Sequence, residues 1–143
     1  MGIYLNPDSS KFEEAVNSDI YVDKTGLLTY TNSVLHTMQK YICISRPRRF
    51  GKSTAANMLT AYYSRGCDAE QIFSQFEIAK DSGFKKYLNK YNTISVNMQE
   101  ILSRSRSIYE LIERFNKLLI RDLKKEYPDV DYFDDTDVIE CMQ

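Results

Sequence analysis

The chain has few of the cysteines and histidines that build zinc sites and no segment suited to crossing a membrane. Its three cysteines, Cys43, Cys67 and Cys141, lie far apart, and His36 is its single histidine, so the ligand spacing of a zinc site is missing. No apolar run approaches the roughly 20 residues that span a bilayer, and the N-terminus lacks a signal-peptide pattern. We therefore expect a cytoplasmic protein without a membrane partner, in which these four residues have structural roles.

Glycine and proline are also scarce, with 5 and 3 residues in a chain of 143. This scarcity excludes a fibrous or low-complexity chain, and 43% hydrophobic with 27% charged residues is typical of a soluble globular protein. The net charge of −1 gives no general attraction to nucleic acid or anionic lipid, so any basic site must be local. The length fits one domain, and no linker-like composition divides residues 1–143.

Apolar residues recur at helical spacing in three segments. The segments 25–40 and 53–63 each carry one apolar face, and the most regular stripe runs through 107–127. Two Glu-to-cation pairs at i,i+4 spacing mark the solvated face of this last helix: Glu110 with Arg114, and Glu113 with Lys117. Shorter helices are predicted to open near Asp68, which resembles the start of a capping box, and near Ser82.

Two further segments have the pattern of strands. Tyr41–Ser45 is short and nearly all apolar, as expected of a strand buried on both faces of a parallel sheet, and Cys43 would pack inside it. Thr93–Met98 alternates apolar and polar residues, which predicts a less buried strand near the sheet edge. The order of helices and strands therefore favours an α/β fold.

The stretch from Ser45 to Thr54 reads SRPRRFGKST and lies between the first expected strand and a helix. The phosphate-loop pattern is glycine, four residues, then Gly-Lys-Ser/Thr. This chain matches it at Gly51, Lys52 and Ser53 but has Arg46 in place of the first glycine. The alternative interpretation is a basic, proline-containing loop in front of an ordinary helix.

Each matching residue suits the binding of a polyphosphate. A loop that leads into a helix N-terminus directs unpaired N–H groups and the positive end of the helix dipole at an anion. Gly51 lets the backbone approach the phosphates, Lys52 supplies an ammonium, and the Ser53 hydroxyl can ligate magnesium. Arg46, Arg48 and Arg49 add positive charge.

A specific resemblance rests on this loop and on the segments around it. The run RPRRFGKST, preceded by YVDKTGLL at Tyr21–Leu28 and followed by a helix ending AYYSRG, resembles the bacterial AAA-ATPase-like family, whose members are often fused to a PD-(D/E)xK-type nuclease. That family's loop typically has arginine at the first glycine position. The likeness runs from about Phe12 to Ile101.

The resemblance implies the N-terminal portion of a three-layer α/β P-loop NTPase-like domain, with an incomplete, mainly parallel sheet. It implies ATP and magnesium as cofactors, with Ser53 as the magnesium ligand. An unfinished sheet would leave edges for pairing with a second copy. The expected cofactor-binding residues are Arg46, Pro47, Arg48, Arg49, Phe50, Gly51, Lys52, Ser53 and Thr54.

The carboxylate that orients magnesium in P-loop ATPases has no good candidate in the sequence. Thr93–Met98 carries Asn97 rather than aspartate, and Asp23 belongs to the YVDKT segment. In similar proteins an apolar strand ending in Asp-Glu-Tyr-Asp comes later than Gln143, which favours a truncated chain. No catalytic residue is therefore assigned.

Three functions remain open at this point. The first is an ATPase whose missing carboxylate comes from Asp23, the acidic tail 129–137 or another subunit. The second is a module that binds nucleotide without hydrolysing it, either an interaction domain or a truncated remnant. The third is a nucleic-acid binder that uses a basic patch, a reading that the net charge does not support. The patch would combine Arg46, Arg48, Arg49 and Lys52 with Arg104 and Arg106.

Overall fold

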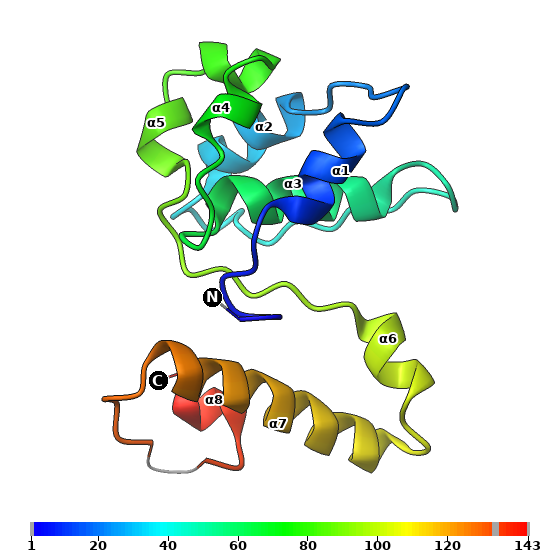
Figure 1. Cartoon of the computed structure of the whole chain (residues 1–143), viewed down its shortest axis with the longest axis vertical. Coiled ribbons are helices and arrows are strands. Elements are labelled where there is room, and N and C mark those ends of the chain that lie inside the picture. Colours follow the sequence, from blue (N-terminus) through cyan, green and yellow to red (C-terminus); the bar gives the residue numbers. More distant parts are fainter. Residues whose placement is uncertain (1, 133–134, 143) are drawn as a thin grey trace. The chain divides into compact units, whose positions relative to one another are not determined.

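The structure is a computed structural model that describes residues 2–132 and 135–142. The chain divides into two compact units. The central unit comprises Asp8–Thr93, and the terminal unit comprises Met1–Pro7 together with Ile94–Gln143. Both units are built from helices and loops (Figure 1).

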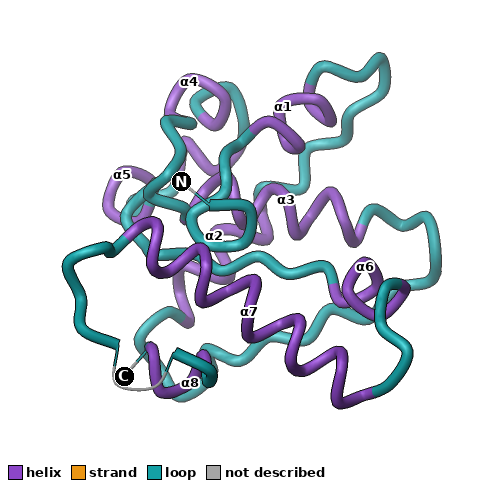
Figure 2. Tube along the Cα trace, turned by 60° about the horizontal axis from the view of Figure 1, so that its bottom comes forward, coloured by secondary structure: helices purple, strands orange, loops and turns teal. Residues whose placement is uncertain are grey.

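The expected α/β fold is wrong, because the described residues contain no β-strand and no sheet. Their ladder-type pairing is limited to two isolated bridges, Leu5 with Ile94 in the antiparallel sense and Ser64 with Tyr91 in the parallel sense. Figure 2 accordingly shows helices and loops and no strand. The expected self-association through open sheet edges therefore loses its structural basis.

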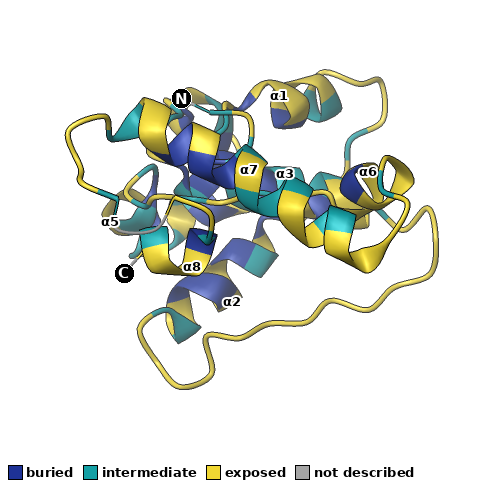
Figure 3. Ribbon diagram, turned by 90° about the horizontal axis from the view of Figure 1, so that it is seen from below, coloured by how far each residue is buried: buried dark blue, intermediate teal, exposed yellow. Residues whose placement is uncertain are grey.

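The segment Tyr41–Ser45 is not a buried strand but part of the exposed connection between two helices (Figure 3). Tyr41 is 86% exposed, and Cys43 is exposed as well. An apolar run becomes a central strand only where neighbouring strands satisfy its N–H and C=O groups on both sides. No described segment pairs with 41–45, so its composition alone does not bury it.

The alternating segment Thr93–Met98 likewise fails to become a strand. Ile94 bridges Leu5, and the Ser95 N–H donates to the Tyr4 carbonyl over 2.8 Å. The pairing stops there, because Asn97 caps a helix that starts at Met98, its side chain accepting the Gln99 N–H. A capping side chain therefore outweighs the period-2 pattern at this point.

The central unit contains six helical elements around one apolar core. Its core is formed by side chains from every one of these elements, among them Phe12, Met58, Phe73 and Phe84. The rings of Phe12 and Phe73 are stacked with centroids 5.0 Å apart. The elements are α1 (Ser10–Val16), α2 (Gly26–Val34), α3 (Lys52–Tyr63), α4 (Glu70–Phe73), the 3₁₀ helix η1 (Glu77–Lys80) and α5 (Phe84–Tyr87).

The helix expected at 53–63 is confirmed as α3, while the helix expected at 25–40 is shorter. It ends at Val34, because Leu35 is extended and His36 has a φ of 62°. Of the two short helices, α4 begins after Ala69 and α5 after Gly83, and neither has a side-chain cap. The capping roles predicted for Asp68 and Ser82 are therefore wrong.

The terminal unit is organised around the long helix α7 (Ile108–Glu126), with α6 (Met98–Ser103) and α8 (Val138–Cys141). Leu5, Leu119, Ile120, Leu123 and Val138 form its core. The buried Asp122 carboxylate accepts N–H groups from Tyr4 at 2.7 Å and Leu5 at 3.3 Å, which ties the N-terminal segment to α7. Among the described residues, no helix combines the length and apolarity needed to cross a membrane.

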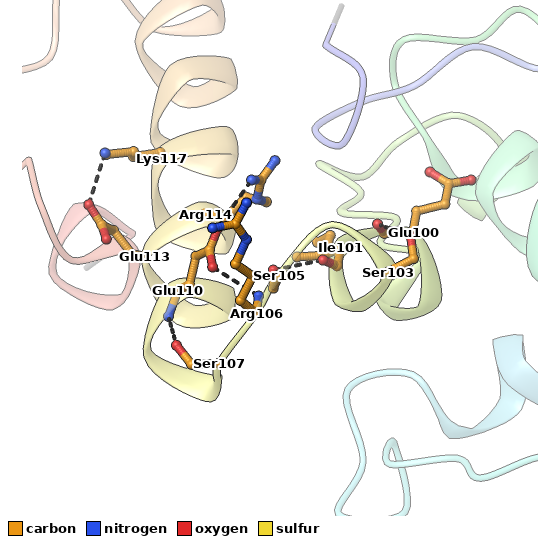
Figure 4. A network of polar contacts seen from close by, with 10 residues as sticks. All are labelled: Glu100, Ile101, Ser103, Ser105, Arg106, Ser107, Glu110, Glu113, Arg114 and Lys117. Atoms are coloured by element: carbon orange, nitrogen blue, oxygen red, sulfur yellow. Dashed lines mark hydrogen bonds and ion pairs between the residues drawn. The ribbon is translucent and has the colours of Figure 1, made fainter.

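Polar contacts at the start of α7 fix the residue at which this helix begins (Figure 4). The Ser107 hydroxyl accepts the Glu110 N–H at 3.2 Å, and the Glu110 carboxylate accepts the Arg106 N–H at 2.9 Å. The first bond satisfies a donor that the helix start leaves unpaired, and the second satisfies the N–H of the residue before the N-cap. The predicted ion pairs are confirmed, with Glu110–Arg114 at 3.6 Å and Glu113–Lys117 at 2.9 Å.

Candidate functional site: the basic loop before α3

The loop 46–51 turns the chain into the first residue of α3, and two of its residues have left-handed backbone conformations. Gly51 is the N-cap of α3 with φ 78° and ψ 25°, a left-handed conformation that favours glycine. Arg49 also has a positive φ, 66°, whereas the φ of Arg46 is not positive. Arginine at the first glycine position of the motif therefore causes no left-handed strain here.

The first turn of α3 presents unpaired backbone donors next to this loop. The Ala55 N–H donates to the Gly51 carbonyl at 2.9 Å, which is the first hydrogen bond of the helix. The N–H groups of residues 51–54 have no acceptor among the described residues. Together with the helix dipole, such donors create a positive potential at the start of α3.

Lys52 turns its ammonium back over the loop. Its Nζ donates to the Pro47 carbonyl at 3.1 Å and also to the Arg46 carbonyl. The side chain thus reaches from the end of the loop back to its beginning, and it is exposed to solvent. Within the described residues it has no carboxylate partner, so its charge faces the two carbonyl oxygens and solvent.

A second ammonium reaches the same loop from a distant part of the sequence. Lys24 Nζ donates to the Phe50 carbonyl at 3.2 Å, across 26 positions of the chain. A Cβ added to Gly51 would collide with this ammonium. The glycine therefore serves both its own backbone conformation and the approach of Lys24.

Asp23 and Thr25 hold Lys24 in place on both sides. The Asp23 carboxylate accepts the Thr25 N–H at 2.8 Å and the Glu77 N–H at 3.0 Å. Partial burial alone would raise the pKa of Asp23, but these hydrogen bonds outweigh it and lower the pKa below its usual value. Thr25 is fully buried, and its hydroxyl accepts the Ile78 N–H at 3.2 Å.

The far end of α3 is fixed by Asn89. Its amide donates to the carbonyls of Ala61 and Ser64, both at 2.8 Å, and more weakly to that of Tyr62. Its side-chain oxygen accepts the Ala69 N–H at 3.0 Å, and its backbone has a φ of 54°. Because these bonds and the core secure α3, the helix is a firm support for the loop at its start.

The remaining predicted binding residues lie on an open surface. Arg46, Pro47, Arg48, Arg49, Phe50 and Ser53 are exposed, and Thr54 is half-buried. The described residues contain no group of three or more His, Cys, Asp or Glu side chains that could hold a metal ion. Phe133 and Asp134, in the acidic tail 129–137, lie outside the described residues.

A shallow hollow occurs elsewhere in the central unit. It is lined by Asp68, Glu70, Gln71 and Ser74, none of which belongs to the loop. Two carboxylates in this lining would repel a phosphate, so the hollow does not suit the chemistry of the loop. The phosphate-loop candidate is thus an open cradle and not an enclosed pocket.

Sequence reasoning placed Gly51, Lys52, Ser53 and Thr54 correctly at the start of a helix, but it missed Lys24 as a neighbour of the loop. Lys24 belongs to the segment YVDKTGLL that carries the family resemblance, but no periodicity or spacing in the sequence connects it to Phe50. The folded chain brings its ammonium to the Phe50 carbonyl across 26 positions. The phosphate-loop motif was therefore the signal in the sequence by which the site could be found.

The site places this chain among helical proteins with a basic anion site. Two lysine ammoniums and the free N–H groups at the start of α3 lie at the same loop. Such an arrangement can hold an anion. The chain belongs to the AAA-ATPase-like family, described as "Predicted AAA-ATPase", which matches residues 9–140. Membership in this family points to nucleotide binding in general. Comparison with curated proteins and with solved structures finds no match.

Proposed function

We propose that this chain binds ATP with magnesium through residues 46–54. The observation that carries the proposal is the convergence of two lysine ammoniums on a loop that ends in a left-handed Gly51, in a member of this family. Neither ammonium forms an ion pair within the described residues. Excess positive charge beside free N–H groups favours a polyphosphate as the ligand.

Each residue of the loop has a defined part in this proposal. The N–H groups of Gly51–Thr54 bind phosphate oxygens, and Lys52 exchanges its carbonyl acceptors for the β and γ phosphates. The Ser53 hydroxyl would hold the magnesium ion that accompanies the phosphates. Arg46, Arg48 and Arg49 contribute positive charge at the rim, while Pro47 and Phe50 supply the loop backbone.

We further favour binding without rapid hydrolysis over an active ATPase. Asp23 is the carboxylate nearest to Lys24 in sequence, but its oxygens already accept the N–H groups of Thr25 and Glu77. A carboxylate engaged in this way is a poor candidate for orienting magnesium or water. Hydrolysis would then require a carboxylate from the acidic tail 129–137 or from another subunit.

A thermal-shift titration with Mg-ATP tests the proposal. At an ATP concentration about 100 times Kd, binding stabilises the folded state by roughly 2.7 kcal/mol, which raises Tm by several degrees. Lys52→Ala should abolish this rise, whereas Lys90→Ala, an exposed lysine of the same unit, should keep it. Equal shifts in all three proteins, or none in any, would refute binding through this loop.

Phosphate release on the same samples separates the two forms of the proposal. A protein that binds Mg-ATP and releases no phosphate above the Lys52→Ala background is a binding module. Lys52-dependent release would instead establish an ATPase and overturn our preference.

Adding a duplex DNA at low salt tests the nucleic-acid alternative, which predicts salt-dependent binding without sequence preference.

A further inference from the structure

We propose that Lys24 is a second phosphate-binding residue of the nucleotide site; this inference rests on the function proposed above. Its ammonium donates to the Phe50 carbonyl at 3.2 Å and lies against Gly51. Phe50 and Gly51 immediately precede the first turn of α3, where the free N–H groups are found. Lys24 therefore places a positive charge beside the atoms that would receive the phosphates.

The ammonium is held at the loop by the backbone on both sides of Lys24. Asp23 fixes the preceding residue through its two accepted N–H groups, and buried Thr25 fixes the following one through Ile78. The Lys24 carbonyl also accepts the Leu27 N–H at 3.0 Å, within the first turn of α2. With its backbone anchored in this way, the lysine can exchange its acceptor by a change of side-chain conformation.

The charge of Lys24 has no carboxylate partner in the described residues, in contrast to the lysines elsewhere in the protein that form ion pairs. Lys85, for example, lies 3.0 Å from Glu70, and Lys117 lies 2.9 Å from Glu113. A neutral carbonyl is a weaker acceptor for an ammonium than an anionic phosphate oxygen. Exchange of the Phe50 carbonyl for phosphate is therefore favourable.

Lys24 and Lys52 approach the loop through different carbonyls. Lys52 donates to those of Arg46 and Pro47, and Lys24 donates to that of Phe50. Their acceptors thus lie at the beginning and the end of the same loop. The two ammoniums bracket the loop, so that Lys24 adds a contact that the phosphate-loop motif alone does not provide.

Affinity measurements on charge-changing variants test this inference. Calorimetric titration with Mg-ATP should show Kd raised about tenfold in Lys24→Gln, because the site is open to solvent and one charge-assisted hydrogen bond is lost. Glutamine keeps an N–H donor for the Phe50 carbonyl but no charge. Lys24→Arg keeps the charge and should stay within about threefold of wild type. Lys90→Gln is the matched control for the loss of one exposed lysine.

The outcomes separate this inference from the proposed function. Suppose that wild type and Lys24→Gln bind Mg-ATP equally well and that Lys52→Ala does not bind it. Lys24 is then no phosphate ligand, and the proposed function stands. If Lys24→Gln and Lys24→Arg are equally weakened, Lys24 acts only by its fit to the loop, and the inference is overturned. If wild type itself does not bind Mg-ATP, both fail. A loss in Lys24→Gln with rescue in Lys24→Arg supports the inference.

Discussion

Replacing Asn89 with alanine should strongly destabilise the central unit, because this one side chain joins the end of α3 to the segment before α4. Its amide donates two short hydrogen bonds, to the carbonyls of Ala61 and Ser64, and its oxygen accepts the N–H of buried Ala69. Alanine removes all three bonds. It must also adopt the φ of 54° that asparagine tolerates better.

The expected loss follows from these contacts. Three hydrogen bonds at about 1 kcal/mol each contribute roughly 3 kcal/mol. The left-handed backbone adds about 1 kcal/mol for a residue with an ordinary Cβ. The Tyr62 carbonyl contributes little to the loss, because it keeps the backbone N–H of residue 89 at 2.7 Å. We expect Asn89→Ala to lower the free energy of unfolding by about 4 kcal/mol.

Urea unfolding followed by far-UV circular dichroism measures this change. Asn89→Gly loses the same side-chain bonds but relieves the backbone, so it should be about 1 kcal/mol more stable than the alanine variant. Asn17→Ala, at the exposed end of α1, is the matched control and should change stability by less than about 0.5 kcal/mol. A loss below about 1 kcal/mol in Asn89→Ala would refute the role given to this side chain.

Two further predictions concern the loop and its support. Gly51→Ala should lower the free energy of unfolding in urea by about 1 kcal/mol, because residue 51 has a φ of 78°. It should also weaken the binding of Mg-ATP more than tenfold, because the new Cβ meets the Lys24 ammonium. Unchanged affinity would contradict this account of the loop. Asp23 has a lowered pKa in the folded state, so its stabilisation is complete above the usual carboxyl pKa of 3.8 and is lost as the pH falls through the lowered value. The stability difference between wild type and Asp23→Asn should therefore shrink from pH 7 to pH 2, and a difference independent of pH would count against the hydrogen bonds from Thr25 and Glu77.

The sequence was sufficient where local signals agreed with one another. The helix 107–127 combined an apolar stripe with two Glu-to-cation pairs along its outer face, and α7 matches it within one residue at each end. The start of α3 was also clear from the Gly-Lys-Ser motif, and the structure adds that Gly51 has a left-handed conformation. Local chemistry determines both features.

Some failures are local, such as the strand at 93–98, which the cap at Asn97 ends. Others depend on contacts between distant residues. Tyr41–Ser45 has a strand composition, but a strand needs partners, and pairing depends on the rest of the chain. Lys24 lies 26 residues from the carbonyl that it contacts, and Asn89 lies 28 residues from Ala61. No local periodicity encodes such distances. The candidate loop could thus be found from its motif, whereas the residues that surround it could not.

Amide chemical shifts of the ¹⁵N-labelled protein, recorded with increasing Mg-ATP, test most directly whether the loop before α3 is a nucleotide site. The account predicts that the largest shift changes occur at the N–H groups of Gly51–Thr54 and saturate with a single Kd. Lys52→Ala should remove them. Saturating changes centred elsewhere, for instance on the hollow at Asp68 and Glu70, or no changes at all, would contradict it.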